Sequence, residues 1–262
     1  MKKLVLFLSL SLFSFLANAT ELVSLIQTYQ ADRGALGRLY TNRLSGEYFT
    51  RMESFNRDYL KTLQAQNYGA LSEDGKIDYV LFRNYLEKQL AELDLEKRDF
   101  MQIQSVIAFG KPLEAFVVGR RRAVQPDAQA LAAQWNQVAQ ALDAQHKALA
   151  TSSKYDSWQK AELAAQAVES LAKVVKESYD FYFDFDPAFT WWMPTPWEKL
   201  DSGMKAYAKA LRAHYTNSVK DDGSGIIGKP IGREALEKQL AYEMIAYSPE
   251  ELIAEAEKQF AW

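Results

Sequence analysis

Apolar residues recur every three or four positions along most of this chain, and that spacing constrains the fold more than any other feature. It is clearest from Ile77 to about Lys97, where the charges lie opposite an apolar side formed by Leu81, Tyr85, Leu86, Leu90 and Leu93. Because a helix turns once every 3.6 residues, this spacing gives it one apolar and one polar face. Helical spacing also marks residues 21–44, 47–68, 126–150, 156–182 and 197–219. The sequence therefore predicts an all-α fold, a multi-helix array of antiparallel helices.

Glycine, proline and small polar residues predict how these helices begin and end. Gly34 and Gly37 weaken the middle of the first helix, so we expect an interruption there, and Pro126 is expected to open a later helix. The polar residues 151–153 form a turn across which the helices on either side are expected to pair as an antiparallel hairpin.

Residues 181–197 break the helical pattern. They contain eight aromatic residues and three prolines, which neither a single helix nor a regular strand accommodates. We therefore expect an irregular, well-packed connection here, and a glycine-rich loop at residues 221–232.

The first 19 residues have the composition of a secretory signal peptide. Lys2 and Lys3 give a positive start, residues 4–16 are apolar, and residues 17–19 read Ala-Asn-Ala, a small-x-small cleavage site. The apolar run is shorter than the roughly 20 residues that span a bilayer. We expect a signal peptide at residues 1–19, a helical domain at 20–262, and a periplasmic or secreted protein.

Charge and cysteine content exclude several classes of partner and site. Loss of Lys2 and Lys3 with the signal peptide leaves 29 basic and 34 acidic residues, which argues against a nucleic-acid partner. No second apolar run approaches membrane-spanning length, so we expect no membrane span after cleavage. The chain has no cysteine, and its 48% hydrophobic residues must form a core that needs no disulfide.

The last helix has a well-defined start. Ser248 is placed as its N-cap, Pro249 as its first residue and Glu251 as its third, which predicts a reciprocal capping box. No glycine, asparagine or proline stop signal follows the last apolar residue. We therefore expect the chain to be the front part of a longer protein.

Two stretches carry a resemblance to a known family. Residues 228–236 read Gly-Lys-Pro-Ile-Gly-Arg-Glu-Ala-Leu and are followed by Tyr-Ser-Pro-Glu-Glu-Leu at 247–252, while residues 73–86 read Glu-Asp-Gly-Lys-Ile-Asp-Tyr-Val-Leu-Phe-Arg-Asn-Tyr-Leu. These stretches resemble the bacterial domain-of-unknown-function family 885, whose members are secreted or periplasmic, largely helical and regarded as zinc-peptidase-like. In that family the His-Glu motif expected to bind metal lies downstream of the Pro-Glu-Glu-Leu helix.

The resemblance implies a function for this chain as part of a larger molecule. It would be the N-terminal, non-catalytic half of an exported zinc-dependent peptidase-like protein, an incomplete part of a helical metallopeptidase-like fold. It would form a wall or cover of the substrate cleft. Together with a missing C-terminal half, it would bind a peptide substrate. Zinc is implied for the full-length family only, and the chain alone would be inactive.

The residues themselves provide no recognisable metal site. Zinc hydrolysis commonly uses two histidines one helical turn apart and a further ligand, whereas His146 and His214 are 68 positions apart and neither begins a His-Glu motif. A Ser-His-Asp triad remains open because its members need not be close in sequence, although no Gly-x-Ser-x-Gly elbow supports one. We assign no catalytic, cofactor-binding or metal-binding residue.

Three further patterns have a structural and a functional interpretation. The Gly-x-Gly-x-x-Gly match at residues 223–228 follows a helix rather than a strand, so we interpret it as a surface turn. Asp180, Asp184 and Asp186 are expected to cap helices or face water while the phenylalanines between them pack, with carbohydrate binding as the functional alternative. The arginines at 120–122 are expected to be solvated, with peptide-carboxylate binding as the alternative, and Trp191, Trp192 and Trp197 to be buried rather than substrate subsites.

A second hypothesis from another class also fits the sequence. The chain could be a stand-alone helical periplasmic binding or scaffold protein without catalysis. A complete protein buries its own apolar faces, so exposure of Phe260, Trp262 and the stripe from Leu236 to Ile245 would favour the first hypothesis.

Overall fold

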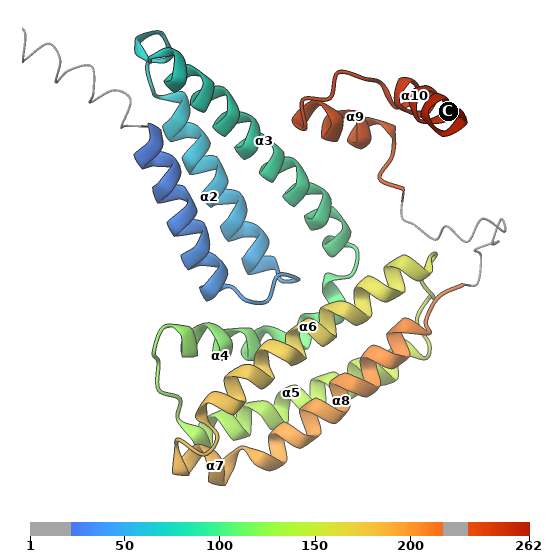
Figure 1. The fold of residues 1–262 in the computed structure, drawn as a ribbon. Helices are drawn as coiled ribbons and strands as arrows, with labels where there is room; N and C mark the ends of the chain where they lie inside the picture. The colour runs from blue at the N-terminus through green and yellow to red at the C-terminus, as the bar shows by residue number, and fades with distance from the viewer. Residues whose placement is uncertain (1–21, 217–229) are drawn as a thin grey trace, which may run out of the picture. The chain divides into compact units, whose positions relative to one another are not determined.

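The computed structural model describes residues 22–216 and 230–262, and within these ranges the chain is almost entirely helical (Figure 1). The described residues contain no β-strand beyond one isolated parallel bridge between Tyr155 and Tyr215. The all-α fold is therefore confirmed. The expected signal peptide and most of the expected glycine-rich loop, including the Gly-x-Gly-x-x-Gly match, lie outside the described residues.

The helices follow the predicted order, with small shifts at their ends. Residues 22–39 form the first helix. It is followed by α2 (Gly46–Gln64), η1 (Tyr68–Ala70), α3 (Glu73–Met101), η2 (Gln104–Gly110), α4 (Lys111–Arg121), α5 (Ala128–Leu149), α6 (Trp158–Tyr182), α7 (Pro187–Trp192), α8 (Pro194–Arg212), α9 (Arg233–Tyr242) and α10 (Pro249–Ala261).

Side-chain caps explain where several helices begin. The capping box at Ser248 and Glu251 is confirmed, because each side chain accepts a hydrogen bond from the backbone N–H of the other residue. Asp127 caps α5 by accepting from the N–H of Ala130, so the helix begins after Pro126 rather than at it. Asp186 caps α7 in the same way.

Two sequence expectations about interruptions were wrong. The first helix continues through Gly34 and Gly37, because isolated glycines weaken a helix without stopping it. Residues 181–197 contain α7 and the start of α8 rather than a wholly irregular connection. Pro187 and Pro194 occupy the first position of these two helices, where a missing N–H costs nothing.

The chain forms two compact units, and each is described by itself. Of the described residues, unit 1 comprises 22–31, 53–92 and 230–262, and unit 2 comprises 32–52 and 93–216. In unit 1, the ring of Tyr29 is 1% exposed and meets aromatic rings from α2 and α3. Its ring centroid lies 5.1 to 5.8 Å from those of Phe55, Tyr59, Phe82 and Tyr85.

The apolar face that α3 buries overlaps the expected one. Leu86 is buried as expected, whereas Leu81 is 48% exposed and Phe82 is buried. The rings of Phe82 and of the expected Tyr85 both contact the ring of Tyr29. The Tyr29 hydroxyl also donates a 2.9 Å hydrogen bond to Oδ1 of the buried Asn56.

In unit 2, α8 packs along both α5 and α6 (Figure 1). We expected α5 and α6 to pack mainly against each other, and this was wrong. Each of them packs more extensively on α8 than on the other. An aromatic core joins them, with the indole of Trp135 in contact with the rings of Phe116, Tyr179 and Trp197. Arg212 at the end of α8 forms ion pairs of 2.6 and 2.9 Å with Glu162 and Glu169 of α6.

The charged and aromatic residues singled out in the sequence have mostly surface positions. Phe185 is 79% exposed and Trp191 81% exposed, so the expectation that they are packed was wrong. Trp197 is half-buried and stacks on Tyr179, as expected.

None of the helices in the described part of the chain has both the length and the apolar composition that crossing a membrane requires.

Gly110 and Gly37 give a matched test of core packing. A Cβ atom at Gly110 would lie 2.4 Å from Cδ2 of the buried Leu171, whereas a Cβ atom at Gly37 would meet nothing within 4 Å. We expect Gly110→Ala to lower the free energy of unfolding by about 1–3 kcal/mol, because Leu171 must leave its position in the core. Gly37→Ala should raise it by up to about 1 kcal/mol through helix propensity. Urea denaturation checks both, and equal effects from the two variants would contradict the expectation.

Candidate functional site

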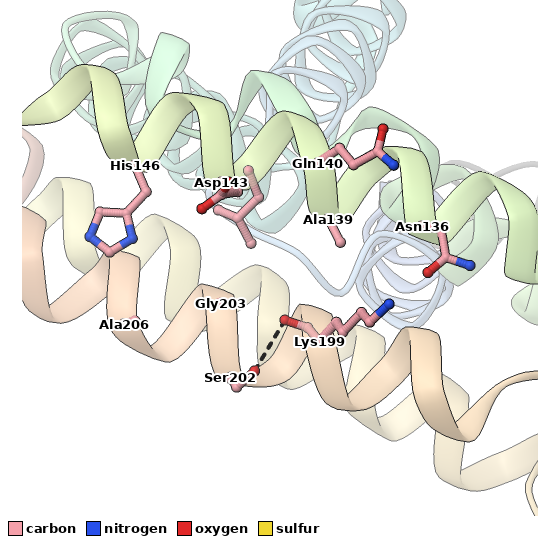
Figure 2. Close-up of a pocket in the computed structure, with 10 residues that line it drawn as sticks. Asn136, Ala139, Gln140, Asp143, His146, Lys199, Ser202, Gly203 and Ala206 are labelled. Atoms are coloured by element: carbon pink, nitrogen blue, oxygen red, sulfur yellow. Dashed lines mark hydrogen bonds between the residues drawn. The ribbon is translucent and has the colours of Figure 1, made fainter.

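A groove of about 590 Å³ lies between α5 and α8 of unit 2 (Figure 2). Polar side chains from α5 line one side, and a lysine, a serine and small residues from α8 line the other. The lining residues are Asn136, Ala139, Gln140, Leu142, Asp143, His146, Lys199, Ser202, Gly203 and Ala206. All of them belong to two well-formed helices, so the groove has rigid walls.

Residue size explains why the groove exists. Ala139, Gly203 and Ala206 occupy positions where larger side chains would fill the space between the two helices. At Gly203 the helices are close, because a Cβ atom there would lie 3.0 Å from Cδ2 of Leu142. Leu142 is 2% exposed and forms an apolar floor.

Some polar groups of the groove already bond to other groups of the protein, and others have donors or acceptors left for a ligand. Asp143 forms a 2.6 Å ion pair with Lys147, and the Ser202 hydroxyl donates to the backbone oxygen of Glu198. Nδ2 of Asn136 donates to the backbone oxygen of Ala132, which leaves its second N–H and its Oδ1 available.

Lys199 and Gln140 have the most unused capacity. Within residues 22–216 and 230–262 the ammonium of Lys199 makes no ion pair and the side-chain amide of Gln140 makes no hydrogen bond. Figure 2 shows the Lys199 side chain extending along the groove towards Asn136. The groove therefore has a cation and several amide groups that a ligand can bind.

His146 lies at the other end of the groove. Its ring centroid is 5.5 Å from that of Tyr207, which is 2% exposed. Burial raises the pKa of Tyr207 to about 12, against a smaller lowering effect of the Gln145 side chain. Gln145 in turn donates to the backbone oxygen of Ser105 over 2.5 Å. These contacts hold the His146 end of the groove in place.

His214 belongs to a different environment. Its Nε2 lies 3.0 Å from Oγ of Ser152 and 3.2 Å from the backbone oxygen of Ser153. A proton on Nε2 satisfies the carbonyl and leaves no lone pair there to accept a proton from Ser152. The Ser152–His214 contact therefore does not have the geometry of a serine nucleophile with its general base.

Neither His146 nor His214 belongs to a group of side chains that could bind a metal ion within the described residues. Across the described part of the chain, no three His, Cys, Asp or Glu side chains are grouped so that they could hold a metal ion. The ligand set that a catalytic zinc requires is therefore not among these residues.

The acidic and basic residues near α7 have structural roles. Asp186 accepts from the backbone N–H groups of Ala188 and Phe189, and Asp180 forms a 2.6 Å ion pair with Lys176, so the capping and surface interpretation is confirmed for both. Arg120 donates to the buried hydroxyl of Ser178, and its guanidinium lies 5.0 Å from the ring centroid of Phe181. Burial and the neighbouring charge of Arg121 lower the pKa of Arg120.

A second polar cluster joins three segments of unit 2 and contains a carboxyl group with a strongly raised pKa. Nδ2 of Asn42 donates to Oε1 of Glu114 over 3.0 Å, and the Ser170 hydroxyl donates to Oδ1 of Asn42 over 3.1 Å. Burial, with a smaller contribution from the charge of Glu47, raises the pKa of Glu114 to about 7, against the hydrogen bond from Asn42 and the charge of Lys111.

The sequence analysis named His146 only as a histidine without a metal motif, and it missed the groove residues. Their signal is a stripe at helical spacing in α5, formed by Asn136, Gln140 and Asp143, opposite Gly203 and Ala206 in α8. This signal can be interpreted only once α5 and α8 are known to be neighbours. Glu114 was missed because a single glutamate in a short helix has no sequence feature that indicates burial.

The raised pKa of Glu114 predicts a pH-dependent stability that Glu114→Gln removes. A carboxyl group with a pKa near 7 in the folded state and near 4.5 in the unfolded state costs stability as pH rises through this range, because the unfolded chain releases its proton first. Glutamine stays neutral and still offers an oxygen to Asn42. The gain in unfolding free energy from Glu114→Gln should be roughly 2 kcal/mol larger at pH 8 than at pH 5.

Urea denaturation of both proteins at the two pH values measures this difference. Glu198→Gln is the matched control, because Glu198 is exposed on the surface of α8. The same pH dependence in both variants would contradict the assignment to Glu114.

Comparison with known proteins identifies the family. No curated protein and no solved structure matches the chain. A family model does match, over residues 28–262, which include every helix from α2 to α10 and the whole of the groove. The resemblance seen in residues 73–86 and 228–252 therefore reflects membership: the chain belongs to the family described as bacterial protein of unknown function, DUF885.

Proposed function

We propose that this chain is the N-terminal, non-catalytic part of an exported peptidase-like protein and that it holds a peptide substrate in the α5/α8 groove. In this proposal the groove is one wall of the substrate cleft. The zinc expected for the full-length family does not fit the described residues, which lack a suitable ligand group, so no chemical step is assigned to them. Residues 1–19 would direct export to the periplasm or the medium.

The observation that carries the proposal is the composition of the groove. An extended peptide needs hydrogen-bonding partners for its backbone amides and an apolar surface for its side chains. Asn136 and Gln140 provide side-chain amides one helical turn apart, and Leu142 provides the apolar floor between the helices. The polar groups of a peptide can therefore remain hydrogen-bonded when it leaves water.

The surface of α9 and α10 supports the part of the proposal that concerns a larger assembly. Neither helix contains a buried residue. Phe260 is 96% exposed and Trp262 103% exposed, while Leu236 and Ile245 are each 38% exposed. Large apolar side chains that are exposed in this way are typical of surfaces that contact other protein. This exposure favours a part of a larger assembly over a stand-alone scaffold.

A groove-filling variant tests the function directly. The exported protein would be incubated with a library of random tetrapeptides that have free ends, and retained peptides would be quantified by mass spectrometry. Ala206→Leu places a larger side chain at the edge of the groove and should reduce retention about tenfold, because the peptide loses its contact with the floor.

Ala133→Leu is the matched control, because Ala133 is exposed on α5 and does not line the groove. It should leave retention unchanged. Equal retention by the Ala206→Leu and Ala133→Leu variants, or no retention by the unaltered protein, would overturn the proposal.

A further inference from the structure

Lys199 gives the groove a chemical preference that its other residues do not. We propose that the α5/α8 groove recognises the C-terminal carboxylate of a short peptide, with the ammonium of Lys199 as the anchoring cation. This inference rests on the proposed peptide-binding function and adds to it the chemical class and the direction of the ligand.

The charges around the groove favour an anionic group at Lys199. Lys147 is paired with Asp143, and Lys205 of the same helix as Lys199 is paired with Asp201 at 2.5 Å. Lys199 has no such partner within the described ranges, so its charge is available to a ligand. A carboxylate accepts hydrogen bonds from an ammonium group more strongly than a neutral carbonyl does.

The amide of Asn136 completes the carboxylate site. Lys199 extends towards Asn136 in Figure 2. The Asn136 amide has an N–H group that is not used within the described structure, and a carboxylate has two oxygens with room for several donors. The ammonium group and this amide can therefore bind one carboxylate together.

The site at Lys199 also sets the direction of the ligand. Figure 2 shows Asp143 between Gln140 and His146, on the side away from Lys199, and Asp143 is paired with Lys147. A peptide with its carboxylate at Lys199 would direct its amino end towards Asp143 and His146, and its preference for the groove depends on Lys199.

The length of the groove limits the length of the ligand. Asn136 and His146 are separated by ten positions in α5, which corresponds to about 15 Å at 1.5 Å per residue. An extended chain advances by about 3.4 Å per residue, so the groove accommodates roughly four residues. A tetrapeptide is the appropriate probe.

The test compares tetra-alanine with a free carboxylate and tetra-alanine with a C-terminal amide, using isothermal titration calorimetry on the exported protein. The unaltered protein should bind the free acid about fivefold more tightly, the contribution of an exposed ion pair. Lys199→Gln should bind both peptides equally, whereas Lys199→Arg should keep the preference. Lys209→Gln is the matched control, because Lys209 is an exposed lysine of α8 outside the groove.

The outcomes separate this inference from the proposed function. The unaltered protein could bind the two peptides equally, and Ala206→Leu could weaken the binding of both. That pair of results would overturn carboxylate recognition and leave the peptide-binding proposal intact. Loss of the preference in Lys209→Gln as well would also overturn the role of Lys199. Binding of neither peptide would contradict both proposals.

Discussion

The position of α8 between α5 and α6 is the constraint on which the rest of unit 2 depends. Leu200, Met204 and Leu211 of this helix are all buried, and its end is held to α6 by the ion pairs of Arg212. Its contact with α5 is close because Gly203 has no side chain to separate it from Leu142. The aromatic core and the groove both result from this arrangement. A change in α8 would therefore alter the fold and the candidate site together.

Local features of the sequence predicted the helices well. The all-α fold and the capping box at Ser248 depend on short-range periodicity and on hydrogen bonds within one turn, which the sequence contains directly. Pro187 and Pro194 misled the interpretation because proline either breaks a helix or starts one. Pro187 starts α7 after the side-chain cap of Asp186, whereas Pro194 starts α8 without a side-chain cap, so the local sequence does not distinguish the two roles.

Long-range features could not be predicted in the same way. The partner of α5 is α8 rather than its neighbour α6, and nothing in either helix indicates this choice. The groove was missed for that reason, since its two walls lie about 60 positions apart in sequence. The exposure of Leu81 in α3 was also missed, because Leu81 and the buried Phe82 next to it are both apolar and compete for the same side of the helix. Burial of Glu114 likewise depends on Asn42 and Ser170, which are distant in sequence.

The walls of the groove are helices, and this has a thermodynamic consequence. Residues on α5 and α8 already have fixed backbones in the unliganded protein, and the ring of His146 lies against the buried Tyr207. A ligand that enters such a groove orders few protein groups, so most of the conformational entropy lost on binding comes from the ligand. The affinity for a flexible peptide is then limited by the conformational entropy that the peptide itself loses on binding. A cyclic or proline-containing ligand of the same length would lose less entropy and occupy the same walls more tightly.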